Sequence, residues 1–189
     1  MKYRESDAKS YRPSLGNLMP DAGSDGEAVV IADAPAAEKR PAPGPRTAAT
    51  AGPGTEIWTD GACSGNPGPM GIGVVILDAG KRKEISEYLG IGTNNIAELV
   101  AVERGLEVAD KLGIAGKDRP VRVYTDSSYS IGVLSKGWKA KANQELIARL
   151  RKRLATMPNV EFVKVAGHAG IPENERCDEL ATTAISRRG

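Results

Sequence analysis

Three consecutive strand-like segments joined by short turns constrain the fold of this chain more than any other feature. They are residues 57–62 (IWTDGA), 71–78 (GIGVVILD) and 83–91 (KEISEYLGI), separated by a Gly- and Pro-rich stretch and by the turn DAGK. Strands connected by turns this short form an antiparallel meander. The folded part of the chain is therefore expected to begin near residue 55.

The periodicity of the apolar residues then changes from that of strands to that of helices. One helical stripe in residues 95–113 is formed by Ile96, Leu99, Val102, Leu106 and Ala109. Two more strands are predicted at 121–126 and 160–166, and three more helices at 127–135, 142–157 and 172–188. This order predicts an α/β fold with a mixed five-stranded sheet and helices on both faces.

Residues 1–54 differ in character from the rest of the chain. The stretch 34–54 is rich in Pro, Ala and Gly, and such a composition cannot bury enough apolar surface to offset its ordering entropy. Only 27–33 (EAVVIAD) is strand-like, and it is too short to stand alone. We interpret residues 1–54 as a disordered tail or linker, with a short docking motif as the alternative, and residues 55–189 as one folded domain.

The overall composition is compatible with one ordinary domain and an appendage. The net charge of +2 neither requires nor excludes a nucleic-acid partner. Cys63 and Cys177 are far apart, which favours a reducing compartment. No apolar run approaches the ~18 residues of a membrane span. We therefore expect a soluble, cytoplasmic protein with no membrane partner.

Four acidic residues occupy positions from which they can converge in such a fold. Asp60 and Asp126 lie near the ends of predicted strands, and ligands of open α/β sheets collect at the carboxyl ends of parallel strands. Glu98 and Asp178 lie on the flanks of the apolar stripes of their helices. Any one of them alone could be a solvated charge, and Asp126 could simply cap a helix. Four converged carboxylates instead predict a site for a hard divalent cation such as Mg²⁺.

His168 is the only histidine of the chain. A lone histidine is more often incidental than functional, but this one lies in a Gly-flanked loop just before the helix that carries Asp178. From there it can reach the acidic cluster. Its imidazole ring suits proton transfer near neutral pH.

Four motifs together resemble ribonuclease H of the type 1 class. They are TDGACSGNPGPMG, TNNIAELVA, YTDSSY and GHAGIPENERCDELA, and the resemblance covers about residues 56–187. It implies the ribonuclease H fold, in which the strand order is 3-2-1-4-5 and the second strand is antiparallel to the others. It makes residues 55–189 a ribonuclease H catalytic domain.

The resemblance also implies an activity and its cofactor. The activity is endonucleolytic hydrolysis of the RNA strand of RNA–DNA hybrids, giving 5′-phosphate and 3′-hydroxyl ends, by a monomer. Two Mg²⁺ ions, for which Mn²⁺ can substitute, would stabilise the attacking water and the leaving oxygen. By the family pattern, His168 assists proton transfer or product release, and the metal ligands are Asp60, Glu98, Asp126 and Asp178.

Substrate contacts follow from the same resemblance. The 2′-hydroxyl distinguishes RNA from DNA, and the residues expected in the minor groove are Cys63, Gly65, Asn66, Asn94 and Asn95. Thr93 and Asn143 match positions that hold a phosphate of the DNA strand. Ser128 stands where a longer side chain often contacts the groove. Ordinary turn and cap chemistry is the alternative explanation for the Asn and Gly residues, and it does not exclude the functional one.

The chain departs from the family pattern between its two middle helices. A basic protrusion that many members carry is reduced to KGWKAKANQE, with Trp138, Lys139 and Lys141 as its remnant. Four basic residues nearby could bind backbone phosphate, but the solvated face of a helix is the preferred interpretation: Arg149, Arg151, Lys152 and Arg153. We expect this chain to differ from its relatives in how it holds the substrate.

Two other hypotheses remain at this point. A DNA recombinase or junction resolvase of the same fold would share the acidic cluster but would usually lack the GNPG and TNN segments. A non-catalytic binding module would have lost the acids, whereas all four acids and the histidine are present here.

Overall fold

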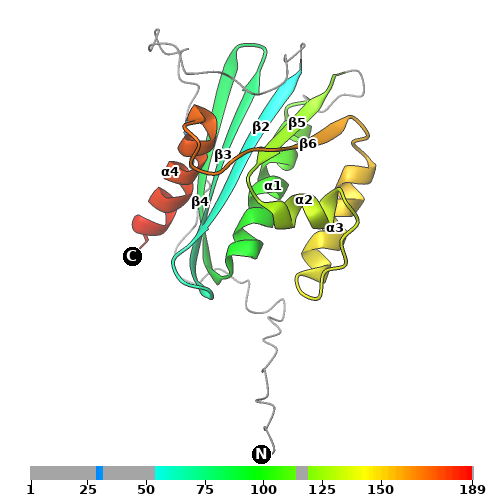
Figure 1. Cartoon of the computed structure of the whole chain (residues 1–189). Helices are drawn as coiled ribbons and strands as arrows, with labels where there is room; N and C mark the ends of the chain where they lie inside the picture. The colour runs from blue at the N-terminus through cyan, green and yellow to red at the C-terminus, as the bar shows by residue number, and fades with distance from the viewer. Residues whose placement is uncertain (1–28, 32–53, 114–118, 189) are drawn as a thin grey trace, which may run out of the picture.

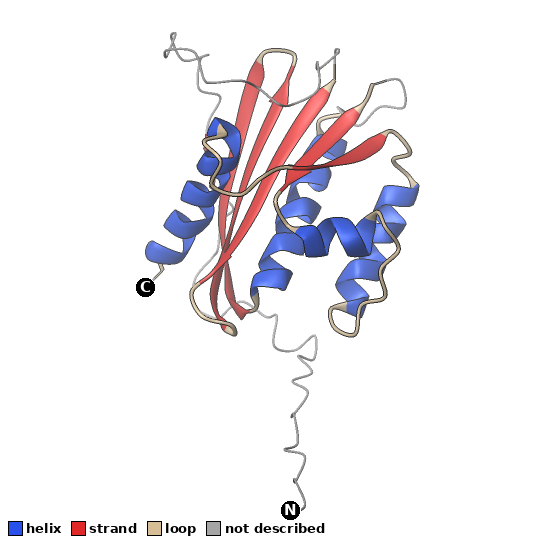
Figure 2. Ribbon diagram, in the orientation of Figure 1, coloured by secondary structure: helices blue, strands red, loops and turns tan. Residues whose placement is uncertain are grey.

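The computed structural model describes residues 29–31, 54–113 and 119–188, and in them a single twisted sheet carries helices on both faces (Figures 1 and 2). In chain order the elements are β1 (Val29–Ile31), β2 (Thr55–Cys63), β3 (Gly68–Asp78), β4 (Lys81–Gly92), α1 (Asn94–Lys111), β5 (Val121–Thr125), α2 (Ser128–Leu134), α3 (Gln144–Ala155), β6 (Val160–Lys164) and α4 (Pro172–Ser186). Within these described ranges, no helix is long and apolar enough to cross a membrane.

The strand order in the sheet is β1-β4-β3-β2-β5-β6. Strand β3 runs antiparallel to both β2 and β4, whereas β2, β5 and β6 are mutually parallel. The five strands predicted from the sequence are β4, β3, β2, β5 and β6 in this order, so the predicted 3-2-1-4-5 topology is confirmed.

Strand β1 adds a sixth strand at the edge of the sheet. Val29 pairs with Ser86 and Ile31 pairs with Glu84, antiparallel to β4. The segment 27–33 is too short to form a sheet alone, but an existing strand edge supplies its hydrogen-bonding partner. The rest of the predicted tail, residues 1–28 and 32–53, lies outside the described residues.

Side chains alternate between the two faces along the central strands. One face is covered by α4, and its apolar cluster includes Trp58 of β2 and Tyr124 of β5, whose rings stack with their centres 4.1 Å apart. The other face is covered by α1, α2 and α3 and holds the larger core, which includes Ile57 and Val123. A single helix therefore covers one face of the sheet, and three helices cover the other.

Glycines let the helices approach the sheet at two places next to the acidic residues. A Cβ atom on Gly73 of β3 would lie 1.9 Å from the carbonyl oxygen of Cys177, so α4 rests directly on that strand. A Cβ atom on Gly61 of β2 would lie 2.3 Å from the backbone nitrogen of Glu98, so α1 lies equally close on the opposite face. Neither helix could keep its position over a larger residue.

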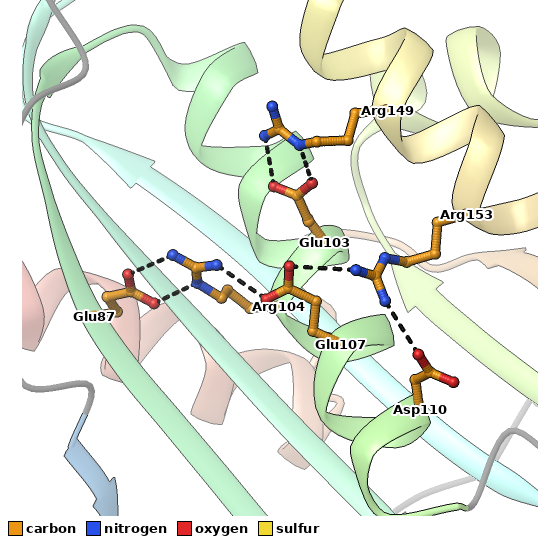
Figure 3. A network of polar contacts seen from close by, with 7 residues as sticks. All are labelled: Glu87, Glu103, Arg104, Glu107, Asp110, Arg149 and Arg153. Atoms are coloured by element: carbon orange, nitrogen blue, oxygen red, sulfur yellow. Dashed lines mark hydrogen bonds and ion pairs between the residues drawn. The ribbon is translucent and has the colours of Figure 1, made fainter.

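Charged side chains connect α1 to β4 and to α3 (Figure 3). Arg104 of α1 binds Glu87 of β4 through two hydrogen bonds of 2.8 and 3.0 Å. The carboxylate of Glu103 is buried and receives two hydrogen bonds, of 2.6 and 2.8 Å, from Arg149 of α3. Arg153 of α3 contacts Glu107 as well as Asp110 of α1.

The basic run of α3 lies on a largely exposed face, as the sequence predicted, but its arginines also make contacts within the protein. Arg149 and Arg153 pair with acids of α1, and Arg151 donates to the carbonyl oxygens of Val133 and Trp138. Because α1 presents acids toward α3, the arginines find protein partners at short range. Acids of α1 therefore partly neutralise the charges of Arg149 and Arg153 before a phosphate approaches.

The contact between β3 and α4 gives a first prediction. Gly73→Ala should lower the free energy of unfolding by about 3 kcal/mol, because the new methyl group must displace the backbone of α4. It should also impair the activity proposed below, because α4 carries Asp178. Chemical denaturation and a cleavage assay measure the two effects.

Gly80→Ala is the matched control for this variant. Gly80 has a φ of 80°, but nothing lies within 4 Å of its hypothetical Cβ. The variant should lose only about 1 kcal/mol through backbone strain and keep its activity. Equal losses of activity in the two variants would contradict the role assigned to Gly73.

Candidate active site

Asp60 and Asp126 are neighbours because β2 and β5 are adjacent and parallel. Trp58 pairs with Tyr124, and each aspartate lies two residues further along its strand direction. Since side chains alternate, both aspartates belong to the face that carries the stacked Trp58 and Tyr124. The predicted convergence of these two acids is therefore built into the strand register.

Glu98 joins this pair from the opposite face of the sheet. It lies in the first turns of α1, and the close approach at Gly61 brings this part of the helix against β2. Carboxylate oxygens of Asp60, Glu98 and Asp126 all lie within 4.8 Å of one another. Three of the four predicted acids thus form one compact group, to which we refer as the acidic centre.

Asp178 lies beside the acidic centre but outside its tightest part. It follows Cys177, whose backbone rests on Gly73, and Gly73 pairs with Asp60. The negative charge of Asp178 contributes to raising the pKa of Asp60. Asp178 therefore approaches from α4, from the same face as Asp60 and Asp126.

The carboxylates of the acidic centre oppose one another's ionisation. Burial, together with the charges of Asp60 and Asp126, raises the pKa of Glu98 to about 9. Burial also raises the pKa of Asp60 to about 6, together with the charges of Asp126 and Asp178. These pKa values are high for carboxyl groups because the charged forms are desolvated and surrounded by like charge.

The donor atoms of the acidic centre fit a hard divalent cation. All of them are carboxylate oxygens, which Mg²⁺, Mn²⁺ and Ca²⁺ prefer. One of them, Oε2 of Glu98, is buried and has no hydrogen-bond partner in the described part of the protein. A buried carboxylate oxygen without a donor is costly, and a cation at this point would satisfy it.

His168 lies in the loop between β6 and α4, at the edge of the acidic centre. Its positive charge acts to lower the pKa of Asp60, which places the ring near that carboxylate. The side chain is exposed and its backbone has a φ of 51°. The preceding Gly167 packs against Asp126, because a Cβ atom there would lie 2.6 Å from Oδ2 of Asp126.

The Gly- and Asn-rich segments predicted to read the minor groove lie next to one another. The side chain of Asn66 accepts a hydrogen bond of 3.2 Å from the backbone N–H of Asn94 at the start of α1. The thiol of Cys63 contacts the carbonyl oxygens of Gly68 and Gly92. Gly65 has a φ of 103°, which a residue with a side chain rarely adopts. Asn94 and Asn95 are both exposed.

Thr93 and Asn143 occupy the N-cap positions of α1 and α3, but neither side chain makes a capping hydrogen bond. Asn143 instead adopts a left-handed backbone with a φ of 59°, which asparagine tolerates better than most residues. Ser128 is exposed at the start of α2, where its hydroxyl contacts the ammonium group of Lys164. Helix capping therefore does not account for the side chains of Thr93 and Asn143.

Sequence reasoning missed the glycines that allow the backbone and the carboxylates of the site to approach closely. Gly61, Gly73 and Gly167 each lie against a backbone or a carboxylate of the site. A glycine directly after Asp60, and another inside an otherwise apolar strand, are the signals that could have indicated such close contacts. Lys164 carries no such signal, because its contact with Ser128 depends on the pairing of β5 with β6.

The site and fold match known proteins. The RNase H family model matches residues 53–186. Two proteins called ribonuclease H are similar in sequence: that of Desulforamulus reducens is 46% identical over 146 residues, covering 69% of this chain and 87% of the relative. The ribonuclease H of Trichodesmium erythraeum is 43% identical over 144 residues, covering 69% of this chain and 88% of the relative.

Solved structures agree with the sequence comparison. LC11-RNase H1, isolated from compost by a metagenomic approach, is 35% identical with a TM-score of 0.63, covering 72% of this chain and 98% of that chain. The same enzyme has been crystallised in complex with an RNA/DNA hybrid, and this structure covers 71% of the present chain with the same TM-score. This chain therefore belongs to the ribonuclease H family, whose members are endonucleases that hydrolyse the RNA strand of RNA–DNA hybrids.

The raised pKa values give a second prediction, for the metal-free protein. The pKa of Glu98 is higher in the folded state, about 9, than its ordinary 4.5, so the folded state binds the proton more tightly. Its contribution to stability is complete below pH ~4.5 and is lost as the pH rises toward 9. Glu98→Gln should remove this loss and stabilise the protein at pH 8 by more than about 1 kcal/mol.

Urea denaturation in EDTA between pH 5 and pH 9 would measure this effect. Glu175→Gln is the matched control, since Glu175 is exposed on α4, and its curve should follow that of the unmodified chain. A Glu98→Gln variant that is no more stable than the unmodified chain at pH 8 would show that burial and the neighbouring carboxylates do not disfavour the ionised form of Glu98.

Proposed function

We propose that this chain hydrolyses the RNA strand of RNA–DNA hybrids at a centre in which four carboxylates hold two divalent cations. The observation that carries the proposal is the compact group of Asp60, Glu98 and Asp126, with Asp178 close enough for its charge to act on Asp60. We propose Mg²⁺ as the native cation, with Mn²⁺ as a substitute, and 5′-phosphate and 3′-hydroxyl ends as the products.

The residues that would hold the cations are Asp60, Glu98, Asp126 and Asp178. When bound, divalent cations would supply Lewis-acid stabilisation of the attacking and leaving oxygens. The protein supplies the fixed positions of the carboxylates: Asp60 lies on β2, Asp126 directly follows the adjacent β5, and the other two lie on helices packed closely against the sheet. Fixed oxygens need no reorganisation during the reaction, and this preorganisation is the main contribution of the chain.

We assign His168 to proton transfer or to release of the product phosphate. Its exposure gives it access to solvent, and its charge is felt at Asp60. An imidazole between the carboxylates and solvent can accept or donate a proton without leaving its loop. Since it touches the centre from outside, its loss should slow the reaction less than the loss of a carboxylate.

The substrate contacts carried over from the family fit the surroundings of the acidic centre. Asn66, Asn94 and Asn95 lie on the connected loops beside α1, where their amides can donate to and accept from 2′-hydroxyls and base edges. Cys63 and Gly65 complete this groove-facing group. Thr93 and Asn143 are proposed to bind a phosphate of the DNA strand, and Ser128 to face the groove next to Asp126.

We further propose that residues 55–189 form the catalytic domain, that residues 1–54 are a tail or linker, and that the protein acts as a cytoplasmic monomer. The match of the family model to residues 53–186 supports this division. Light scattering of the intact chain tests the monomer, and fractionation of the source cells tests the location. A stable dimer, or a membrane-bound fraction, would contradict the respective part of the proposal.

Cleavage of a labelled hybrid tests the activity. With Mg²⁺ the intact chain should cut the RNA strand, and with EDTA it should not. Asp60→Asn should lower the rate at least ~1000-fold while the fold persists, because Asn keeps the size of the side chain but loses the charge that holds a cation. Circular dichroism verifies that the variant is folded.

Duplex DNA and a four-way junction serve as control substrates in the same assay. A shortened protein chain that begins at Gly54 is assayed on the hybrid beside the intact chain. An intact RNA strand after incubation with ample Mg²⁺ or Mn²⁺ would refute the activity. Preferential cutting of the junction would indicate a resolvase instead. Loss of cleavage in the chain that begins at Gly54 would refute the proposed division into tail and catalytic domain.

A further inference from the structure

The arginines of the described residues are largely engaged in contacts within the protein. From Arg82 to Arg176, every arginine forms an ion pair with a carboxylate or donates to a carbonyl group of the protein. The arginines of α3, the basic run nearest to the shortened protrusion, are held by α1 and by the loop at Trp138. A hybrid carries one phosphate per nucleotide on each strand, so the lysines must provide much of the remaining attraction.

Lys164 is a lysine that the sheet places beside the segment leading into Asp126. It is the last residue of β6, and its backbone pairs with Thr125, the residue directly before Asp126. Its side chain is exposed, and its ammonium group donates to the hydroxyl of Ser128, two residues after Asp126. Within the described residues, no carboxylate lies within ion-pair distance of Lys164.

The pairing of Lys164 with Ser128 joins two positions at the edge of the candidate site. Ser128 is too short to extend far from α2, whereas the lysine side chain reaches it from the neighbouring strand. An ammonium group has three donors, and the serine hydroxyl takes only one of them. The serine therefore fixes the direction of the charge and leaves donors for an outside acceptor.

A purely structural role explains this arrangement poorly. Both partners are exposed, and a hydrogen bond between exposed groups contributes little to stability because water replaces it at almost no cost. A cation next to the strand end that leads into Asp126 would also reduce the repulsion that a phosphodiester meets on approaching the centre.

We propose that Lys164, oriented by Ser128, binds a backbone phosphate of the hybrid beside the scissile bond. This inference rests on the proposed function, and it adds a substrate-binding residue that lies outside the motifs of the family resemblance. The long side chain of Lys164 can extend to a phosphate that the short side chain of Ser128 cannot contact. Its positive charge, unlike those of Arg149 and Arg153, is not paired with a carboxylate of the described part of the protein. Its contribution is to substrate affinity and not to the chemical step.

The test combines steady-state cleavage kinetics with equilibrium binding of the hybrid in EDTA, followed by fluorescence anisotropy over a range of salt concentrations. Lys164→Gln should raise KM and the dissociation constant roughly 3- to 10-fold at ~0.1 M salt, with kcat unchanged. The slope of log affinity against log salt should fall by about 1, the value for one phosphate contact. Lys164→Arg should restore most of the affinity and the slope.

Two further variants sharpen the test. Ser128→Ala should raise KM less than Lys164→Gln and leave the salt slope nearly unchanged, because it frees the ammonium group without removing it. Lys81→Gln is the matched control: Lys81 is exposed at the turn between β3 and β4, beside the opposite end of β2, and should change neither KM nor slope.

The outcomes separate this inference from the proposed function. If the unmodified chain does not cut the hybrid, the proposed function fails. If it cuts the hybrid and Lys164→Gln keeps the original KM and salt slope, only the role of Lys164 is refuted. A fall in kcat with unchanged KM would also refute it, because Lys164 would then act in the chemical step.

Discussion

Electrostatic repulsion among carboxylates that the fold forces together is the constraint on which the rest of this structure depends. The register of β2 and β5 sets Asp60 beside Asp126, and α1 presses Glu98 against them. The repulsion and the burial appear directly in the raised pKa values of Glu98 and Asp60. The protein tolerates this arrangement because the surrounding sheet and helices hold the carboxylates in place. A bound cation would reduce the repulsion among them.

The elements around the acidic centre are held by contacts that leave little freedom. Gly61 and Gly73 remove the side chains that would separate α1 and α4 from the sheet. Ion pairs then connect α1 to β4 and α3, as Figure 3 shows, and Arg176 connects α4 to Glu84 of β4. This use of arginine inside the protein has a consequence for substrate binding, because it leaves lysines such as Lys164 as the cations available to phosphate.

The sequence predicted the parts of the fold that depend on local pattern. The strand and helix order followed from periodicity, and Asp60 and Asp126 could be placed together because both were predicted near the ends of strands expected to be parallel neighbours. The sixth strand, Val29–Ile31, could not be predicted with the same means, because a three-residue strand depends on the edge of β4. The partners of Arg149 and Arg153 and the contact of Lys164 with Ser128 were equally hidden, since each joins residues that are far apart in the chain.

The central claim is that carboxylates from four separate segments surround one cation-binding centre. Substoichiometric Mn²⁺ added to the ¹⁵N-labelled protein tests it, because a paramagnetic ion broadens the amide signals of nearby residues. The amide signals of Gly61, Glu98, Asp126 and Asp178 should lose intensity first and together, while the signal of Leu112 at the far end of α1 should stay sharp. Broadening that follows exposed acids such as Glu161 and Glu179, with no preference for the acidic centre, would contradict it.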